Sequence, residues 1–598
     1  MFQRVSHGGG ESIPAPAPRT PARYRDLVTD PATRPPLLLP TPRRVQAIDG
    51  PGAPPDAPHT ERLAPAHHPE GYTLTISGQI TIESASDAGA AHARRTLDQL
   101  RSQYPDAVPP LRIEDAPAMG VRGVMLDVSR TRVPTMPDLL AQVRLLAQLK
   151  LNHLQLYVEH AFAYRGHEDA WRSADPITPA ELATLDATCR DLHVTLAANQ
   201  NCFGHMERWL RLPRYAHLAE THDEFDFYGI RRRGPFSLCP TDPAALDLIE
   251  DLLTQQLEVV SSGLVNIGCD ETADLGAGRS AEAVQRLGKA QVYLEHVNRV
   301  CEIARSLGAT PMLWGDIALA EPERLGELHE GAIALAWGYE PDSPFETWGR
   351  SLDDAGRPWL ACPGTSSWRS ITGRTSERRE NLASATRAAL AHAAEGMLLT
   401  DWGDLGHHQQ PAIALLAIAE FAQAAWNPKS PPDPDAISLH VFGDRSLRVA
   451  RWLAQLGDAD LPLRRVSGVP APDATPTPLR NGSALFEVLH PSGAPNAPPS
   501  DPAPWHAARQ RLDALEVDMP RGLEPDLTDQ LRHTLETARF AAELALARRG
   551  RPPTGPMAPR LKGLIGAHER LWLRRSRPAG LEESTRYLLD LLARLPDG

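Results

Sequence analysis

The pattern of apolar and polar residues divides the chain into stretches of different character. In the first patterned stretch, apolar and polar residues alternate in two short runs, Thr73–Ile76 and Ile80–Ile82, on either side of Ser77-Gly78. Alternation on both sides of a turn predicts a β-hairpin. A helical pattern follows at about Asp87–Arg101, and these elements predict a small α+β domain that ends near Pro117.

The middle of the chain repeats a short apolar run followed by a helical pattern. Continuously apolar runs are typical of parallel strands that are buried on both faces. Helical patterns such as Asp138–Leu149, Ala244–Val260 and Leu382–Ala394 separate them. The candidate strands are Val124–Val128, Leu154–Val158, Val194–Ala198, Leu264–Ile267, Pro311–Trp314, Ile333–Trp337, Trp359–Cys362 and Met397–Thr400.

Strands alternating with helices in this way predict an α/β protein built on a closed (β/α)8 barrel, also called a TIM barrel. An open, doubly wound sheet is the alternative, but the chain lacks the G-x-G-x-x-G turn typical of that fold. Beyond about Trp426 the alternation stops. Residues 468–504 are proline-rich, which predicts a loop or linker, and helical periodicity dominates from Trp505 onward.

These changes of pattern divide the chain into four segments. We expect a proline-rich leader over residues 1–60 and a small N-terminal α+β domain over residues 61–118. The catalytic barrel would occupy residues 119–428, and a linker with a mostly helical C-terminal region would occupy residues 429–598.

The net charge, the lack of long apolar stretches and the cysteine pattern indicate which partners and which compartment to expect. The 598 residues carry a formal net charge of −13, which argues against nucleic acid as the main partner. No apolar stretch reaches the roughly 18 residues of a membrane span, and the N-terminal residues lack the apolar core of a secretory signal. The six cysteines form no C-x-x-C pair, which is typical of reduced thiols. We therefore expect a cytoplasmic protein without a membrane partner.

Two adjacent carboxylates, Asp270 and Glu271, follow the apolar run Leu264–Cys269. Like charges held close together push one pKa upward. A proton donor beside an ionised carboxylate is what cleavage of a glycosidic bond requires. We interpret the pair as catalytic; an acidic helix N-cap after a strand is the structural alternative.

Acids, amides, an arginine and several tryptophans follow the other strands. The active site of a (β/α)8 barrel is assembled at the C-terminal ends of its strands. Indole rings stack on the apolar faces of sugars, and charged or amide side chains pair with hydroxyls, so this set is typical of a carbohydrate site. The candidate substrate-binding residues are Arg130, Glu159, His160, Asn201, His205, Trp314, Trp337, Trp368, Trp402 and Asp404.

These candidates have other interpretations. Tryptophans at strand ends often only pack, Arg130 can simply pair with a neighbouring carboxylate, and His205 can be structural. A divalent metal is a further alternative, with ligands drawn from Glu159, His160, His205, Asp270, Glu271 and Asp316. No His-x-His or His-x-x-x-His spacing supports it. We expect neither a metal nor a cofactor.

At these residues the chain resembles glycoside hydrolase family 20, the β-N-acetylhexosaminidases, as a divergent member of bacterial type. The segments that carry the resemblance are Ile113–Pro117, Arg122–Arg130, Gly204-His205 and Ile267–Glu271, within a similarity that covers about residues 70–425. The resemblance implies a retaining mechanism in which the 2-acetamido group of the substrate attacks the anomeric carbon. The protein would then be an exo-acting hydrolase that removes terminal β-linked N-acetylhexosamine from oligosaccharides.

The resemblance also implies roles for individual residues. Glu271 would be the general acid/base, and Asp270 would hold and polarise the acetamido group. Arg130 would grip hydroxyls at the non-reducing end, and Asp404 with Trp402 would bind and stack the terminal sugar. The walls of the acetamido pocket would be Trp314 and Trp337.

The chain departs from the family pattern around this pocket. After strand two, Glu159-His160 stands where the family commonly has a Ser-Asp-Asp-type stretch. The tyrosine-x-aspartate pair after strand seven is missing, and Gly364–Trp368 stands there. A hydroxyl from Tyr164 or Tyr339 would be a substitute.

Two alternatives without an acetamido role stay open. The first is a retaining β-glycosidase for a non-acetylated sugar, in which Glu271 pairs with another protein carboxylate. The second is a non-catalytic, sugar-binding barrel. The candidate partner carboxylates in the first case are Glu159, Asp316, Asp401 and Asp404.

Overall fold

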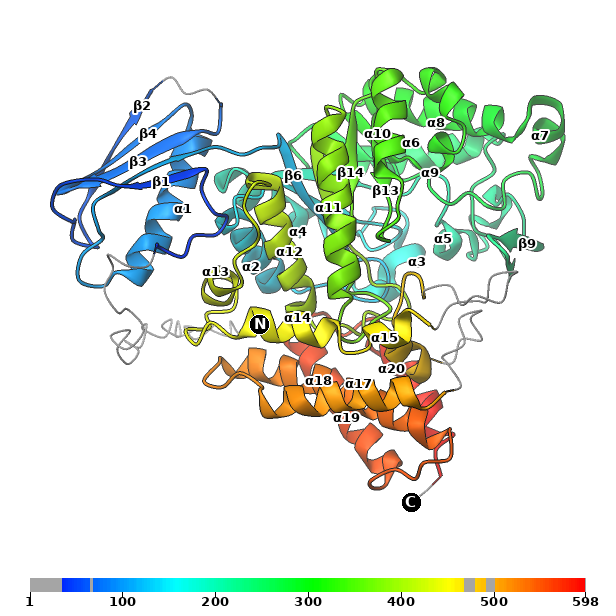
Figure 1. Ribbon diagram of the computed structural model, residues 1–598. Helices are drawn as coiled ribbons and strands as arrows, with labels where there is room; N and C mark the ends of the chain where they lie inside the picture. Colours follow the sequence, from blue (N-terminus) through cyan, green and yellow to red (C-terminus); the bar gives the residue numbers. More distant parts are fainter. Residues whose placement is uncertain (1–34, 65–67, 467–478, 491–500, 597–598) are drawn as a thin grey trace, which may run out of the picture.

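The structure is a computed structural model that describes residues 35–64, 68–466, 479–490 and 501–596. Three parts are visible in Figure 1: a small sheet domain in blue, a barrel ringed by helices in cyan to yellow-green, and a layer of helices in yellow to red beneath the barrel. Each part corresponds to one of the patterned stretches of the sequence.

The N-terminal part is a five-stranded sheet covered by one helix, α1 (Asp87–Gln103). The predicted hairpin is present as β3 and β4, and α1 begins where the side chain of Ser86 accepts a hydrogen bond from the backbone N–H of Gly89. The strands, in spatial order, are β1 (Arg44–Ala47), β5 (Leu111–Asp115), β3 (Tyr72–Ser77), β4 (Gln79–Ser84) and β2 (His59–Leu63).

This sheet corrects the expected start of the domain. Strand β1 and the first residues of β2 lie within the stretch 1–60 that we expected to be a leader. Residues 1–34 of that stretch lie outside the described residues. All four residues of β1 are exposed, so this edge strand shows none of the apolar alternation by which a strand is recognised in a sequence. The division into domains remains a proposal, with the sheet beginning near residue 44.

The eight predicted parallel strands form a closed barrel, which confirms the expected fold. Closure is made by β15 on β6, which pair from Gly396 with Val121 to Asp401 with Leu126. The strands in chain order are β6 (Val121–Asp127), β7 (His153–Tyr157), β8 (Thr195–Asn199), β11 (Leu264–Asn266), β12 (Thr310–Trp314), β13 (Ile333–Trp337), β14 (Trp359–Cys362) and β15 (Gly396–Asp401).

Helices surround the barrel, and large side chains fill its interior. The interior cluster contains Met125, Tyr157 and Met312, together with the tryptophans at the strand ends. A (β/α)8 barrel is therefore a packed core with a site only at its mouth. The main outer helices are α2 (Met136–Gln148), α4 (Pro179–Asp191), α6 (Pro243–Leu257), α8 (Lys289–Ser306), α10 (Phe345–Asp354), α11 (Thr375–Ala391) and α12 (Pro411–Trp426).

The long connection after β8 carries a hairpin that we did not anticipate. Strands β9 (Glu224–Phe227) and β10 (Ile230–Arg233) pair antiparallel across a two-residue turn. The turn residues Tyr228 and Gly229 have φ values of 51° and 87°. Positive φ at both central positions matches a type I′ turn, the tightest common hairpin connection. Short helices also occur in the connections that follow several barrel strands. They are α3 (Glu168–Trp171) after β7, α5 (Glu207–Leu210) after β8, α7 (Ala281–Leu287) after β11 and α9 (Asp316–Leu319) after β12.

The C-terminal region is helical, as predicted. One helix, α16 (Ala484–Leu489), lies within the stretch 468–504 that we expected to be a loop, because the Ser483 side chain caps an apolar run. Residues 467–478 and 491–500 of that stretch lie outside the described residues. The other helices are α13 (Pro434–His440), α14 (Val449–Gly457), α15 (Leu461–Arg464), α17 (Ala503–Val517), α18 (Pro525–Ala547), α19 (Met557–Arg575) and α20 (Leu581–Leu592).

The last helices contact loops at the barrel's mouth. Ser584 of α20 donates a hydrogen bond of 2.5 Å to the carbonyl oxygen of Gly406, in the loop that follows β15. Gly580, just before α20, lies so close to Thr131 that a Cβ atom there would collide with the Thr131 carbonyl oxygen. The C-terminal region therefore supports the two loops that follow β6 and β15. Among the described helices, none has both the length and the apolar character needed to cross a bilayer.

Candidate active site

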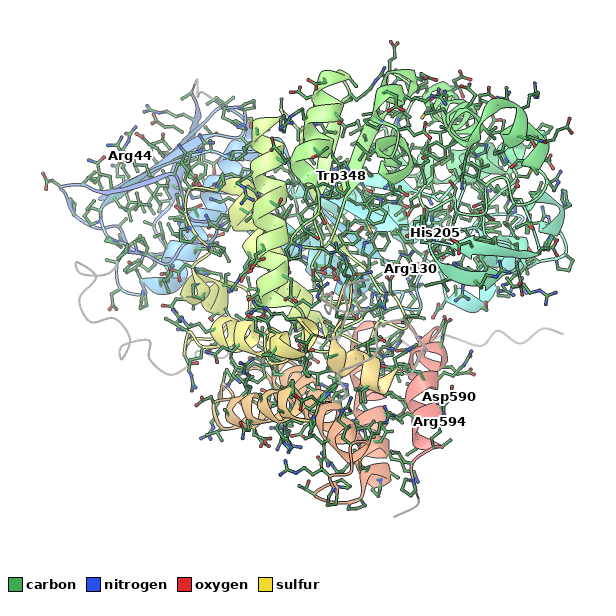
Figure 2. The ribbon with its side chains drawn as sticks, turned by 45° about the vertical axis from the view of Figure 1, so that its right-hand side comes forward. Arg44, Arg130, His205, Trp348, Asp590 and Arg594 are labelled. Carbon is green, nitrogen blue, oxygen red and sulfur yellow. The ribbon has the colours of Figure 1, made fainter. Side chains whose placement is uncertain are left out.

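Charged side chains from several strand ends meet at the mouth of the barrel. Arg130 follows β6 and His205 lies in the connection after β8; both are labelled close together in Figure 2. They share a neighbour, because Glu159 Oε1 lies 3.8 Å from an Arg130 nitrogen and 3.6 Å from His205 Nδ1. The strand ends thus bring into one cluster residues that are far apart in the sequence.

The paired acids lie against the other edge of the His205 ring. His205 Nε2 is 3.4 Å from Asp270 Oδ2 and 3.2 Å from Glu271 Oε2. The Asp270 side chain is 8% exposed and that of Glu271 is 28% exposed. Asp270 is thus enclosed while Glu271 reaches toward the opening, which is the arrangement needed for one buried anchor and one accessible proton donor.

An unusual backbone conformation presents the pair. Cys269 and Glu271 have φ values of 73° and 51°, and His205 has 60°. Side chains other than glycine rarely adopt this left-handed conformation, and such strain gathers at functional sites. Gly268 precedes them with φ 69°, and a Cβ atom there would collide with Asn201. Glycine is therefore required at position 268 for the chain to turn both acids into the mouth.

His205 is held as a cation. Burial by itself would lower the pKa of the imidazolium, but the charge of Asp270 and the close contacts of the ring with Asp270 and Glu271 outweigh burial and raise the pKa to about 10. A positive charge between two carboxylates compensates part of the repulsion between them. From the sequence we predicted that His205 belongs to the site, but we did not predict that its ring is charged.

Asp316, at the start of α9, forms a hydrogen bond with the backbone of the acid pair. Its Oδ2 accepts a hydrogen bond of 3.0 Å from the backbone N–H of Glu271, and its Oδ1 accepts one of 3.3 Å from Trp337 Nε1. Burial and the charge of Asp270 raise the pKa of Asp316 from 3.8 to about 8. Asp316 is thus neutral through much of the neutral pH range and fixes the strained peptide at Glu271.

Arg130 lies at the centre of a second group. Its guanidinium stands 4.8 Å from the ring centroid of Tyr157 and 4.7 Å from that of Trp402. Its nitrogens lie 3.3 Å from Asp127 and 3.5 Å from Asp404. Asp127 also accepts a hydrogen bond from the backbone N–H of Gly403, which ties the ends of β6 and β15 together. Arg130 is therefore fixed in orientation, with its planar fork presented at the barrel's mouth.

Aromatic rings form the wall between the two groups. Trp402 packs 5.8 Å from Trp314, and Trp337 stacks 5.3 Å from Tyr339, measured between ring centroids. Trp368 meets the Tyr339 ring edge-on at 5.0 Å. Among the described residues, the buried Nε1 atoms of Trp314 and Trp368 and the Oδ1 atom of Asp270 have no hydrogen-bond partner, so they suit a polar ligand.

Two of the predicted residues have other surroundings. Asn201 is fully buried and donates a 2.7 Å hydrogen bond to the Tyr157 hydroxyl, so it orients a neighbour of Arg130. His160 is buried, and burial lowers its pKa to about 3. No contact found among the described residues joins His160 to the charged cluster. Tyr164, considered as a substitute hydroxyl, bonds instead to Gln200 and Gln256 within the outer core.

Four further residues complete the cluster: Asp316 and Tyr339, which the sequence offered only in alternative roles, and Asp127 and Tyr157, which we did not select. Tyr157 is the last residue of β7 and points into the barrel, where its hydroxyl donates a 3.0 Å hydrogen bond to Glu159. The period-2 pattern of a strand was the available signal for Tyr157. Tyr339 lies two residues beyond β13, and Trp402 Nε1 donates a 2.8 Å hydrogen bond to its hydroxyl.

The cluster has one combination of side chains that suits a metal ion. His205, Asp270 and Glu271 each offer a ligand atom, and these atoms lie within 4.8 Å of one another. The same atoms form the close contacts described above, with His205 Nε2 at 3.4 Å from Asp270 and 3.2 Å from Glu271. These contacts between the imidazole and the two carboxylates account for the grouping.

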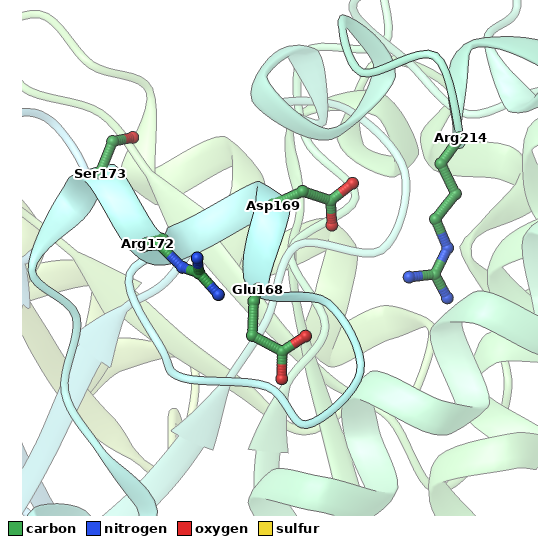
Figure 3. A pocket seen from close by; sticks show the side chains of 5 residues that line it. All are labelled: Glu168, Asp169, Arg172, Ser173 and Arg214. Carbon is green, nitrogen blue, oxygen red and sulfur yellow. The ribbon is translucent and has the colours of Figure 1, made fainter.

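A hollow of about 550 Å³ lies over α3 and is shown in Figure 3. It includes none of the residues expected at the active site. Asp169 and Arg214 extend into it from opposite sides. Its lining is Glu168, Asp169, Arg172, Ser173 and Arg214, whose charges balance. We assign no role to it.

Two protein-family models match the chain. The model described as glycosyl hydrolase family 20, domain 2, matches residues 37–116, and that described as glycosyl hydrolase family 20, catalytic domain, matches residues 120–349. Together the two matches span more than half of the 598 residues. The second match ends before β14, so Trp368, Trp402 and Asp404 lie beyond it.

Individual relatives are more distant. The chain is 25% identical to a β-N-acetylhexosaminidase of Cellulomonas fimi over 50% of this chain and 58% of the relative. It is 28% identical to hexosaminidase D of Bos taurus over 32% of this chain and 56% of the relative, so each alignment spans little more than half of the relative. An exo β-N-acetylglucosaminidase structure from Vibrio harveyi shares the fold, with a TM-score of 0.56 and 16% identity over 70% of this chain and 78% of that one.

Proposed function

Because this chain belongs to glycosyl hydrolase family 20, we propose that it is an exo-acting glycoside hydrolase that removes a terminal β-linked N-acetylhexosamine from an oligosaccharide. The observation that carries the proposal is the placement of Asp270 and Glu271 on one edge of a charged His205, 3.4 and 3.2 Å from its Nε2 atom. The aromatic wall beside them suits a sugar ring.

The proposed reaction is substrate-assisted. Glu271 gives its proton to the glycosidic oxygen as the bond to the anomeric carbon breaks, and the acetamido oxygen of the substrate attacks that carbon to form a cyclic oxazolinium ion. Glu271 then takes a proton from a water molecule whose oxygen attacks the anomeric carbon. The bond between that carbon and the acetamido oxygen breaks, so the product keeps the configuration of the substrate. Asp270 accepts the acetamido N–H through its unpartnered Oδ1 and so directs the acetamido oxygen.

His205 and Asp316 act through these acids. The cationic ring contacts both acids and stabilises the carboxylate that Glu271 becomes after it gives up its proton. Neutral Asp316 holds the Glu271 peptide without adding a third negative charge. This division leaves one carboxylate as anchor and one as proton donor.

The acetamido pocket would be closed by Trp314, Trp337, Trp368 and Tyr339. Tyr339 replaces the hydroxyl that the family has after strand seven. Trp402 Nε1 donates to the Tyr339 oxygen and so orients the hydroxyl, which would donate its proton to the acetamido carbonyl oxygen when substrate binds. The missing tyrosine-x-aspartate pair is thus compensated from a neighbouring strand.

The non-reducing end of the sugar would meet Arg130 and Asp404, with Trp402 beneath its ring. Arg130 pairs with carboxylates on both sides, so it offers a fixed fork to sugar hydroxyls. Binding at this end directs cleavage to the terminal sugar. A cytoplasmic location, and hence a role on imported or recycled oligosaccharides, remains our prediction from the sequence.

The structure gives little support to a second protein carboxylate as nucleophile. Asp401 accepts hydrogen bonds of 2.7 Å from both Thr365 and Ser367. Asp316 holds the Glu271 peptide, and Asp404 is paired with Arg130. Glu159, the fourth candidate, accepts a hydrogen bond from the Tyr157 hydroxyl and lies between Arg130 and His205. Each of the four carboxyl groups thus has a partner of its own, which favours the acetamido group as the nucleophile.

The proposal is tested by following an aryl β-N-acetylglucosaminide by proton NMR during hydrolysis. The β-anomer of N-acetylglucosamine should appear first, and Glu271→Gln should slow cleavage most for leaving groups of high pKa. First appearance of the α-anomer, or an unchanged rate with Glu271→Gln, would contradict the proposed role of Glu271.

A further inference from the structure

The hairpin β9–β10 lies directly against the catalytic cluster. A continuous series of ring contacts joins the two: His205 to Phe236 at 4.9 Å, Phe236 to Phe227 at 5.3 Å, and Phe227 to Tyr228 at 5.1 Å between ring centroids. In Figure 2 the teal hairpin runs beside the labelled His205. The turn of the hairpin is therefore fixed relative to the acid pair.

A cation locks the base of this hairpin. The Arg232 guanidinium lies 4.5 Å from the ring centroid of Phe236 and 5.2 Å from that of Phe227, and it pairs with Glu207 of α5. Cation–π contacts of this kind stabilise the packing of the two elements. The hairpin is thus a built part of the mouth.

The tip of the hairpin presents an aromatic ring to the solvent beside the acids. Tyr228 is 60% exposed, although it sits in a constrained two-residue turn. Its ring is joined to His205, which contacts both acids, through the rings of Phe227 and Phe236. A large exposed aromatic side chain next to a polar site suits a ligand that has both an apolar face and hydroxyls.

We propose that the tip of the β9–β10 hairpin forms the subsite for the leaving group, with the Tyr228 ring stacking on the sugar that is released. The inference rests on the proposed function, because it assigns the reducing-end side of the same substrate. Glu271 must face the glycosidic oxygen, and the hairpin packs through Phe236 on His205, whose Nε2 atom lies 3.2 Å from Glu271. Arg130, which would bind the non-reducing end, lies beside Glu159 at the Nδ1 edge of His205. The occupant is therefore a pyranose ring on the far side of the cleaved bond.

The test compares two substrates that differ only in the leaving group. N,N′-diacetylchitobiose has a sugar there, whereas β-N-acetylglucosaminyl fluoride has a single atom that cannot reach Tyr228. In Tyr228→Ala, the ratio of kcat/KM for the disaccharide to kcat/KM for the fluoride should fall about tenfold, mostly through KM, since one stacking contact is worth about a factor of ten. Tyr228→Phe should restore most of the ratio, because it keeps the ring.

Ile230→Ala is the matched control, because Ile230 is 57% exposed on the same hairpin. Its ratio should equal that of the wild type. An unchanged ratio in Tyr228→Ala, or an equal loss on both substrates, would overturn the subsite. If the wild type cleaves neither substrate, the proposed function itself is wrong and the subsite falls with it, so the two failures are distinguishable.

Discussion

The indole Nε1 of Trp402 donates a 2.8 Å hydrogen bond to the hydroxyl of Tyr339, which joins the loop after β15 to the loop after β13. In the proposed mechanism, this contact places a phenol at the acetamido pocket of a barrel that has no tyrosine after its seventh strand. The Tyr339 ring stacks on Trp337 and meets Trp368 edge-on, so its position is fixed from three sides.

Replacement of Tyr339 by phenylalanine removes only the hydroxyl. We expect kcat/KM for an aryl β-N-acetylglucosaminide to fall about 100-fold, because the hydroxyl would stabilise charge that develops on the acetamido oxygen. Tyr164→Phe is the control, since that hydroxyl bonds to Gln200 and Gln256 in the outer core. Equal kinetic effects of the two variants would refute the special role of Tyr339.

Asp316 should act as an acceptor for the Glu271 peptide. Asp316→Asn keeps an oxygen that can accept this hydrogen bond, whereas Asp316→Ala removes it. We expect kcat to fall by about tenfold or more in the alanine variant and to be largely kept in the asparagine variant. Steady-state kinetics of the two variants measure this difference. A comparable loss of kcat in both would show that the charge of the carboxyl group is needed instead of its hydrogen bond.

The same residue predicts how stability depends on pH. The pKa of Asp316 is about 8 in the fold, against about 4 in an unfolded chain, and that of His205 is about 10 against about 6.5. Both values are raised, so the folded state holds these protons more tightly. The contribution of Asp316 is fully present below about pH 4 and lost by about pH 8, and that of His205 is lost as pH rises through about 10.

The free energy of unfolding should therefore decrease as the pH is raised from about 6 to 9, by at most about 1.4 kcal/mol per pH unit for each proton involved. Denaturant titrations at several pH values measure this slope. Asp316→Asn cannot titrate, so its slope should be shallower between about pH 5 and 8. A slope identical to that of the wild type would mean that Asp316 is ionised in the fold.

Arg130 should bind substrate through its planar fork. Arg130→Lys keeps the charge but loses the two-pronged geometry and the stacking on Tyr157 and Trp402, so we expect kcat/KM to fall about 100-fold. Arg350→Lys is the control, because Arg350 is an exposed residue that pairs only with Glu346 among its described contacts. Full activity of Arg130→Lys would leave the residue as a simple counter-charge for Asp127.

The C-terminal helices should hold the mouth in place. Gly580→Ala would force a Cβ atom into the Thr131 carbonyl oxygen, next to Arg130. Gly550 has almost the same conformation, φ 83° against 82°, but open space around it, so Gly550→Ala reports the backbone strain alone. Thermal denaturation should show Gly580→Ala less stable than Gly550→Ala by about 2 kcal/mol or more, with reduced activity. Equal stabilities of the two variants would mean that the backbone at Thr131 shifts to accommodate the Cβ atom without loss of stability.

The barrel was predictable because its strands are mostly apolar and because helical patterns separate them. Strand β1 and the β9–β10 hairpin were not predicted. The four residues of β1 are all exposed, and the short strands of the hairpin carry charges such as Arg231 and Arg233. The available signal for the hairpin was the Tyr228-Gly229 turn between two short strands, which fits a type I′ connection.

The position of the acid pair followed from its place at the end of a strand, since parallel strands of a barrel end at one mouth. The contacts between residues of different strands across the mouth could not be predicted in this way. Tyr339 reaches Trp402, and Asp316 reaches the Glu271 peptide, only through the closed barrel. The raised pKa of His205 depends on burial between two carboxylates, which no linear pattern contains.

In the proposed mechanism, the substrate's acetamido group is the nucleophile and Asp270 directs it. The most direct measurement is the hydrolysis of an aryl β-N-acetylglucosaminide beside the matching aryl β-glucoside, by the wild type and by Asp270→Asn. We predict cleavage of the acetylated substrate alone, and a loss of about 100-fold or more in Asp270→Asn. Efficient cleavage of the plain glucoside, unaffected by the substitution, would contradict the account and would require a protein nucleophile.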